Sequence, residues 1–144
     1  MTDRHPYRLP RHEIVRKKKL ISLLFTGGMS LKCNFLRMVY LSHNDVRGGF
    51  SSPLSVMFAV SKKTLPSAVM RNRAKRLMRE AYRIEKPLLQ KRIEELQGKE
   101  KAGEISIVFL YTQRGSHIPP LTDFRLEMNS ALRQMLLGTG RRKV

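Results

Sequence analysis

Apolar residues recur along the chain with two different periods, which predict strands in some segments and helices in others. Alternation at every second position is typical of strands, and a spacing of three to four residues is typical of amphipathic helices. A period of two, or a short continuous apolar run, predicts four strands, at Met29–Cys33, Phe35–Ser42, Leu54–Ser61 and Ile105–Thr112. The helical spacing predicts three helices, at Glu13–Phe25, from the capping residue Ser67 through Arg83, and at Leu121–Leu137.

The predicted elements follow the order helix, strand, strand, strand, helix, strand, helix, written α-β-β-β-α-β-α. Strands and helices that segregate in this way pack as one sheet against helices, so the fold class is α+β, a single-domain α/β sandwich. Leu54–Ser61 is almost continuously apolar, which favours a central position in the sheet. Alternation within Phe35–Ser42 places Leu36, Met38 and Tyr40 on one side of their strand.

The segments outside this domain are basic or polar. We expect residues 1–12 to form a mobile basic arm, residues 13–137 to form the domain, and residues 138–144 to form a basic tail. A polar linker is predicted at Gln97–Glu104 and a loop at His43–Pro53. Pro87 is expected to end or kink the second helix, because proline removes a helical hydrogen bond.

The charge of the chain limits the kinds of partner it suits. Lys and Arg number 29 against 11 Asp and Glu, giving a formal net charge of +18 in 144 residues. Repulsion of that size destabilises the fold unless a polyanion relieves it, so nucleic acid is the first candidate and an anionic membrane surface the second. No apolar run approaches the ~20 residues of a membrane span. No apolar signal core follows Met1, and the lone Cys33 cannot form an internal disulfide, so we expect a cytoplasmic protein.

The densest charge lies in Arg71–Arg83, the run R-N-R-A-K-R-L-M-R-E-A-Y-R. On a helix, one side carries an apolar stripe that can face a core, made of Met70, Ala74, Leu77, Met78, Ala81 and Ile84. The opposite side carries Asn72, Lys75, Arg76, Arg79, Tyr82 and Arg83, with Arg71 and Arg73 on the flanks. A charge run can be only a solvated helix face, but such faces usually mix signs, and only Glu80 and Glu85 dilute this one. The pattern therefore favours an anionic partner.

Residues that could perform chemistry are scattered along the chain. The aspartates Asp3, Asp45 and Asp123 stand in different segments, and so do the histidines His5, His12, His43 and His117. Neither a metalloprotease H-E-x-x-H motif, a P-loop nor zinc-ligand spacing is present. The sequence therefore indicates a binding protein, with no catalytic residue and no metal ligand of its own.

Three parts of the sequence resemble a known family. They are S-K-K at Ser61–Lys63, A-V at Ala68–Val69, and the arginine-rich run Arg71–Arg83, and together they resemble the signature of the bacterial ribonuclease P protein component. The resemblance extends over roughly Lys17 to Leu137. Thr64–Ser67 departs from it, because the family often has glycine there.

The resemblance implies a function. It identifies the chain as the protein subunit of ribonuclease P, an endoribonuclease that removes the 5′ leader from precursor tRNA. The expected partners are the catalytic RNA subunit and precursor tRNA, with no DNA and no membrane. The RNA partner is expected to hold the catalytic centre and the magnesium ions, and the protein alone to bind none.

Two RNA surfaces are predicted from the residues and the resemblance together. The first binds RNA through phosphates and comprises Lys62, Lys63, Arg71, Asn72, Arg73, Lys75, Arg76, Arg79 and Arg83. The second binds the leader by stacking its bases beside positive charge, in a cleft between the first helix and the sheet, with Phe25, Met38 and Tyr40. Phe58 is expected to be an ordinary core aromatic.

Two other functions fit parts of the pattern. A non-catalytic, ribosomal-type RNA-binding protein has the same composition, and only the long signature separates the two. A DNA-binding regulator would place the basic helix in a major groove, but such a helix needs a partner helix and a short turn before it. Here a strand and Pro66 come before the basic helix instead.

Overall fold

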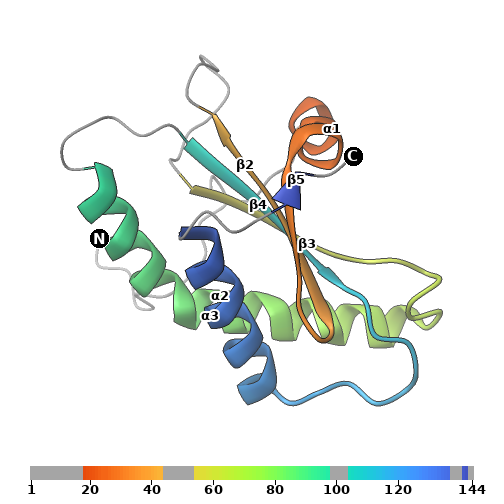
Figure 1. Ribbon diagram of the computed structural model, residues 1–144. Helices are drawn as coiled ribbons and strands as arrows, with labels where there is room; N and C mark the ends of the chain where they lie inside the picture. Colours follow the sequence, from red (N-terminus) through yellow and green to blue (C-terminus); the bar gives the residue numbers. More distant parts are fainter. Residues whose placement is uncertain (1–17, 44–53, 98–103, 137–140, 143–144) are drawn as a thin grey trace, which may run out of the picture.

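A five-stranded sheet forms the centre of the structure, with the strand order β3-β4-β2-β1-β5 (Figure 1). The computed structural model describes residues 18–43, 54–97, 104–136 and 141–142. The strands are β1 (Met29–Lys32), β2 (Leu36–His43), β3 (Leu54–Val60), β4 (Glu104–Tyr111) and β5 (Arg141–Arg142). β3 and β4 are parallel, and the other neighbouring strands are antiparallel.

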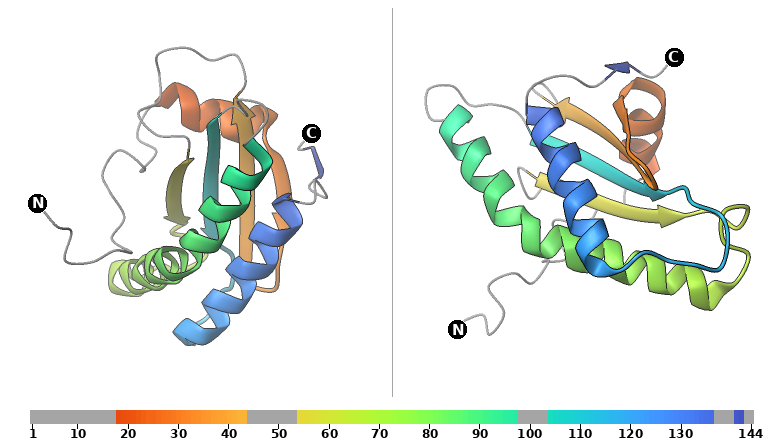
Figure 2. Two further views of the ribbon diagram at one scale, coloured as in Figure 1. Left: turned by 90° about the vertical axis from the view of Figure 1, so that its left-hand side faces the viewer. Right: turned by 60° about the horizontal axis from the view of Figure 1, so that its bottom comes forward.

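Within the described residues three helices cover the sheet, one on one face and two on the other (Figure 2). They are α1 (Lys18–Gly27), α2 (Ala68–Gln97) and α3 (Leu121–Leu136). α2 and α3 pack against each other and against the same face of the sheet, and α1 packs on the opposite face against β2 and β4. The predicted α+β sandwich and its element order are confirmed, with β5 as an addition.

Alternation along the strands divides the buried side chains between the two faces. The larger core lies under α2 and α3 and receives Leu36 and Met38 from β2 and Ile107 and Phe109 from β4. A smaller cluster lies under α1, where Leu24 packs with the residues one position further along the same strands, Val39 and Val108. Because neighbouring residues of a strand point to opposite faces, β2 and β4 contribute to both layers.

Helix α2 is continuous over 30 residues and passes through Pro87. Ser67 caps it as predicted, since its Oγ accepts a hydrogen bond from the backbone N–H of Met70 at 3.4 Å. Pro87 does not end the helix, and α2 changes direction in its second half (Figure 1). This is the kink that the sequence left open as one of two outcomes.

One sequence prediction about the sheet needs correction. The apolar strand β3 lies at an edge and not at the centre, because within the described residues it pairs with β4 alone. Its apolar character reflects cover on both faces, where Val56 faces α2 and Met57 packs near α1. The basic tail contributes β5, whose Arg141 pairs with Ser30 of β1. The arm of residues 1–12 and most of the predicted loop and linker lie outside the described residues.

Gly28 fixes the position of α1 on the sheet. A Cβ at this residue would lie 2.4 Å from the carbonyl oxygen of Leu24 and 2.9 Å from a methyl group of Val39. The backbone N–H of Gly28 donates to the same Leu24 carbonyl at 3.0 Å, which closes the last turn of α1. Only glycine allows the chain to pass this close to the sheet and enter β1 directly.

Glu127 of α3 joins the helical layer to the start of β2. Its carboxylate is buried, and Oε1 accepts hydrogen bonds from the backbone N–H groups of Phe35 at 3.1 Å and Leu36 at 3.2 Å. Burial raises the pKa of this carboxyl above its usual value, although the two backbone hydrogen bonds act in the opposite direction. The two hydrogen bonds need an acceptor oxygen at this position, whereas burying the negative charge of the carboxylate costs free energy.

Glu127→Gln tests this balance, since the amide keeps an acceptor oxygen and has no charge. A raised folded-state pKa means that the stabilisation is fully present below the unfolded pKa and is lost as pH rises through the folded pKa. We therefore expect the free energy of unfolding of the variant to rise relative to that of the natural chain as the pH rises above the unfolded-state glutamate pKa of about 4.3. Denaturant unfolding at several pH values measures this difference.

Glu127→Ala is the matched control, because it removes both the charge and the acceptor. It leaves two buried N–H groups without a partner and should cost about 2 kcal/mol or more at low pH, and this cost should fall as pH rises because the natural chain itself loses stability. A stability difference between the Gln variant and the natural chain that does not change with pH would contradict the assignment of the raised pKa.

Candidate RNA interface

The first half of α2 and the turn before it carry all nine residues predicted to bind RNA. Three of these side chains are half-buried, and two of the three are also paired within the protein. Lys62, Lys63, Asn72, Arg73, Arg76 and Arg79 are exposed, whereas Arg71, Lys75 and Arg83 are half-buried. Residues three and four apart on a helix share a side. Asn72, Arg73, Arg76 and Arg79 therefore form one continuous exposed surface, called here the arginine face.

The arginine face keeps its positive charge because the two nearby glutamates are engaged elsewhere. Glu80 forms an ion pair with Arg83, one turn further along the helix. Glu85 is buried and accepts hydrogen bonds from Arg125 Nε at 3.0 Å and Asn129 Nδ2 at 2.8 Å, both on α3. Within the described part of the chain, Arg73, Arg76 and Arg79 have no acidic partner.

Tyr82 does not belong to the exposed side of α2, as the sequence had suggested. Its ring is fully buried and packs with Phe58 and Phe109, each at a centroid distance of 5.8 Å. The buried stripe is wider on this flank because α2 contacts both the sheet and α3. Phe58 packs against the same core, in agreement with the sequence prediction.

Arg71 differs from the other arginines of α2 because its guanidinium binds backbone carbonyl groups of the protein itself. Nη1 donates to the carbonyl oxygens of Leu65 at 2.9 Å and Pro66 at 2.7 Å. Both hydrogens of this nitrogen are therefore used within the chain.

The residues predicted to hold the leader do not come together. Met38 is fully buried in the core under α2 and α3, and Tyr40 packs against that same core. Phe25 lies on the opposite face of the sheet, against Leu24 and Val39. The prediction that Phe25 meets the face of Leu36, Met38 and Tyr40 is therefore wrong in geometry. The physical reason is that α1 covers the other parity of β2, which the alternation alone does not reveal.

The face of the sheet that carries α1 offers a different set of residues. Phe25, Met57 and Leu110 are partly buried there, and Arg37 and Lys32 are exposed on the same side of the sheet. Lys32 pairs with Arg37 across β1 and β2, and Arg37 pairs with Leu110 across β2 and β4, so cations and apolar side chains stand in one row. Nε of Arg37 donates to Ser30 Oγ at 3.0 Å. The name α1 face is used here for five of these residues, which are Phe25, Lys32, Arg37, Met57 and Leu110.

Comparison with known proteins identifies the family. The sequence matches the family described as Ribonuclease P over residues 9–134. It is 40% identical to the ribonuclease P protein component of Chlorobaculum tepidum over 136 residues, which cover 94% of this chain and 88% of that protein. It is 38% identical to the protein of the same name from Chlorobium phaeobacteroides, with 96% and 94% covered.

The chain belongs to the bacterial ribonuclease P protein family. Its role is that of a protein subunit in tRNA processing, and a ribosomal-type RNA-binding protein is not favoured. The fold agrees with this assignment. The structure of the Staphylococcus aureus RNase P protein superimposes with a TM-score of 0.58 at 15% identity, covering 85% of this chain and 94% of that one. A mutant of that protein, described as defective in mRNA degradation activity, gives a TM-score of 0.59 at 14% identity, with 89% of each chain covered.

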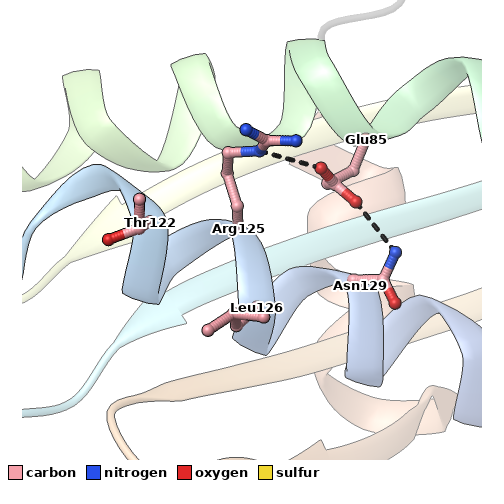
Figure 3. Close-up of a pocket in the computed structure, with 5 residues that line it drawn as sticks. All are labelled: Glu85, Thr122, Arg125, Leu126 and Asn129. Atoms are coloured by element: carbon pink, nitrogen blue, oxygen red, sulfur yellow. Dashed lines mark hydrogen bonds and ion pairs between the residues drawn. The ribbon is translucent and has the colours of Figure 1, made fainter.

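A pocket of about 500 Å³ lies between α2 and α3 of this family member, lined by Glu85, Thr122, Arg125, Leu126 and Asn129 (Figure 3). Arg125 and Asn129 point toward Glu85, and their hydrogen bonds occupy its carboxylate. The polar groups of the pocket thus hold α3 against α2.

The described residues show no constellation for hydrolysis. No three His, Cys, Asp or Glu residues among them stand close enough to hold a metal ion. Burial raises the pKa of the Cys33 thiol, and the negative charge of Glu127 raises it further, so the thiol stays protonated and is a poor nucleophile. Within the same residues, no helix is long and apolar enough to cross a membrane.

Removal of exposed arginines tests the arginine face. We expect Arg76→Ala to weaken binding of the catalytic RNA and to lower the slope of log affinity against log salt by about 0.7–0.9, the effect of one lost phosphate contact. The combined replacement of Arg73, Arg76 and Arg79 should lower the slope about three times as much. Filter binding or fluorescence anisotropy over a range of salt concentrations measures both quantities.

Arg133→Ala is the matched control, because Arg133 is also an exposed helical arginine but lies on α3. It removes the same net charge and should leave the salt slope unchanged. Equal slopes for Arg76→Ala and Arg133→Ala would show that the arginine face makes no specific phosphate contact.

Proposed function

We propose that this chain serves ribonuclease P by holding two RNA segments on two separate surfaces. The arginine face binds the catalytic RNA, and the α1 face binds the 5′ leader of precursor tRNA. The catalytic centre and its magnesium ions belong to the RNA partner, so the complex acts as an endoribonuclease whose protein has no catalytic group. A cytoplasmic location follows from the processing of newly made tRNA.

The observation that carries the proposal is the unneutralised charge of the arginine face. Arg73 and Arg76 are exposed and have no acidic partner within the described residues, while neighbouring glutamates are paired with Arg83 and Arg125. Guanidinium groups bind phosphate through two parallel hydrogen bonds. A one-sided array of them on a rigid helix suits a folded RNA, in which phosphates lie close together.

The α1 face suits an unpaired strand better than a duplex. Phe25 and Leu110 offer partly exposed apolar surface on which bases can stack, and Arg37 and Lys32 offer charge for the backbone between the bases. Bases in a duplex are already stacked and paired, so this combination gains little from one. Tyr40 lies on the other face of the sheet, outside the α1 face, and Met38 is completely buried.

Reconstitution tests the function as a whole. We expect protein purified free of RNA to leave precursor tRNA intact, because the described residues hold no metal cluster or activated nucleophile. Added to the catalytic RNA at low magnesium, the protein should increase the rate of cleavage at the mature 5′ end. Site-specific cleavage by the protein alone, surviving nuclease treatment and repurification, would contradict the proposal.

Arg37→Ala tests the assignment of the leader to the α1 face. Loss of one charge-assisted hydrogen bond should weaken binding of precursor tRNA to the assembled complex by about tenfold. Mature tRNA lacks the leader and should bind as before. Equilibrium binding of both RNAs to the same preparation gives the comparison.

Two further variants control this experiment. Arg133→Ala changes the net charge equally and should affect neither RNA. Lys32→Ala, one strand away on the same face, should repeat the selective loss of precursor binding. If Arg37→Ala weakens precursor and mature tRNA equally, the leader does not lie on the α1 face.

A further inference from the structure

The two lysines before α2 stand on a tightly bonded turn. The carbonyl oxygen of Ser61 accepts hydrogen bonds from the backbone N–H groups of Thr64 at 3.2 Å and Leu65 at 3.1 Å. Ser61 Oγ also accepts from the Thr64 N–H at 3.1 Å and lies 2.9 Å from Thr64 Oγ1. Lys62 and Lys63 occupy the two middle positions and are exposed. Residues 61–66 are called here the lysine turn.

The lysine turn is joined to α2 by Arg71. The side chain of Leu65 is buried in the core, with 2% of its surface exposed. The carbonyl groups of Leu65 and Pro66 are at the end of the lysine turn that leads into α2. Nη1 of Arg71 donates to both of them, at 2.9 Å and 2.7 Å, and the backbone N–H of Arg71 donates to the Ser67 carbonyl at 3.0 Å. The hydrogen bonds of Arg71 thus connect the lysine turn to the beginning of α2.

The position of Arg71 on α2 explains why it differs from Arg73. Arg71 precedes the buried Met78 by seven residues, which is two helical turns, so it stands above the buried flank. Arg73 lies on the exposed side and has no hydrogen-bond or ion-pair partner among the described residues. The two arginines have equal charge and stand two residues apart, but their surroundings differ.

We propose that Arg71 is a positioning residue, which holds Lys62 and Lys63 in a fixed place beside the arginine face. Its contribution to RNA binding passes through the lysine turn and not through a phosphate contact of its own. This inference deepens the proposed function. Its statement about RNA binding rests on that function, and its statement about the position of the lysine turn does not. A turn that is already ordered loses less conformational entropy when the lysines bind a polyanion, so the affinity of both lysines depends on Arg71.

Amide hydrogen exchange in the protein alone tests the positioning. Arg71→Met removes the guanidinium and keeps an unbranched stem, and Arg73→Met removes the same charge two residues away. We expect Arg71→Met to speed exchange at the Thr64 and Leu65 amides by about tenfold, because the turn loses both of its ties to α2. Arg73→Met should leave these amides unchanged. Equal exchange in the two variants would overturn the proposal.

A double-mutant cycle tests the consequence for RNA. Arg71→Met should weaken binding of the catalytic RNA in the natural background and have little further effect when Lys62 and Lys63 are both alanine. Arg73→Met should cause the same loss in both backgrounds. Additive effects of Arg71→Met and the lysine replacements would show that Arg71 contacts RNA directly, and would overturn its assignment as a positioning residue.

The two measurements separate this inference from the proposed function. Exchange at Thr64 and Leu65 is read without RNA, so it decides the positioning whether or not the arginine face binds RNA. If the lysine replacements alone leave RNA affinity unchanged, the lysine turn is not an RNA contact and the RNA-binding half of the inference fails. Should Arg71→Met also lower the melting temperature, exchange at amides of β2 and β4 distinguishes local opening of the turn from global unfolding.

Discussion

The packing of α2 between the sheet and α3 is the constraint on which the rest of the structure depends. Ala74, Met78 and Ala81 are completely buried on one side of the helix, and two small alanines let the helix approach its neighbours closely. Burial of this stripe fixes the rotation of α2 about its axis. The direction in which Arg73 and Arg76 project is therefore decided by apolar residues that make no contact with a ligand.

The same packing explains how a helix with so much positive charge can be stable. Repulsion between arginines one turn apart disfavours the helix, and the usual remedy is a carboxylate on the same surface. Here Glu85 is buried against Arg125 and Asn129, where it holds α3 in place and leaves the arginine face uncompensated. Tertiary burial on one side of the helix thus supports a charge pattern that the isolated helix would resist.

Sequence periodicity predicted the helices and strands well, but it predicted less well which of them pack against one another. Alternation assigned Leu36, Met38 and Tyr40 to one face of β2, and the helical spacing assigned Ala74 and Met78 to the core, both as observed. Both signals are local, since they depend on side-chain geometry within one element. Which face of the sheet α1 covers is a property of tertiary packing, and so Phe25 was placed with the wrong parity. The edge position of β3 was missed for the same reason, since cover on both faces produces an apolar run at an edge as well as at the centre.

The roles of single polar residues were the least predictable from sequence. Arg71 and Arg73 are identical in type and lie in one cationic run, yet Arg71 binds two carbonyl groups of its own chain. Tyr82 carries a hydroxyl that fits a polar surface, yet its ring is enclosed by Phe58 and Phe109. In each case the deciding partner is an atom of another segment, which neither spacing nor composition specifies.

The two proposed RNA surfaces lie on opposite faces of one sheet, and this arrangement has a mechanical consequence. β2 and β4 contribute Val39 and Val108 to the α1 side and Met38 and Phe109 to the α2 side, so both layers share the same two strands. Close-packed interiors deform little, so a displacement of α1 relative to α2 would disturb both cores at once. A leader held on the α1 face and an RNA held on the arginine face would therefore keep a fixed separation and orientation. Setting the geometry between two RNA segments is therefore a contribution to tRNA processing that the fold of this subunit can make.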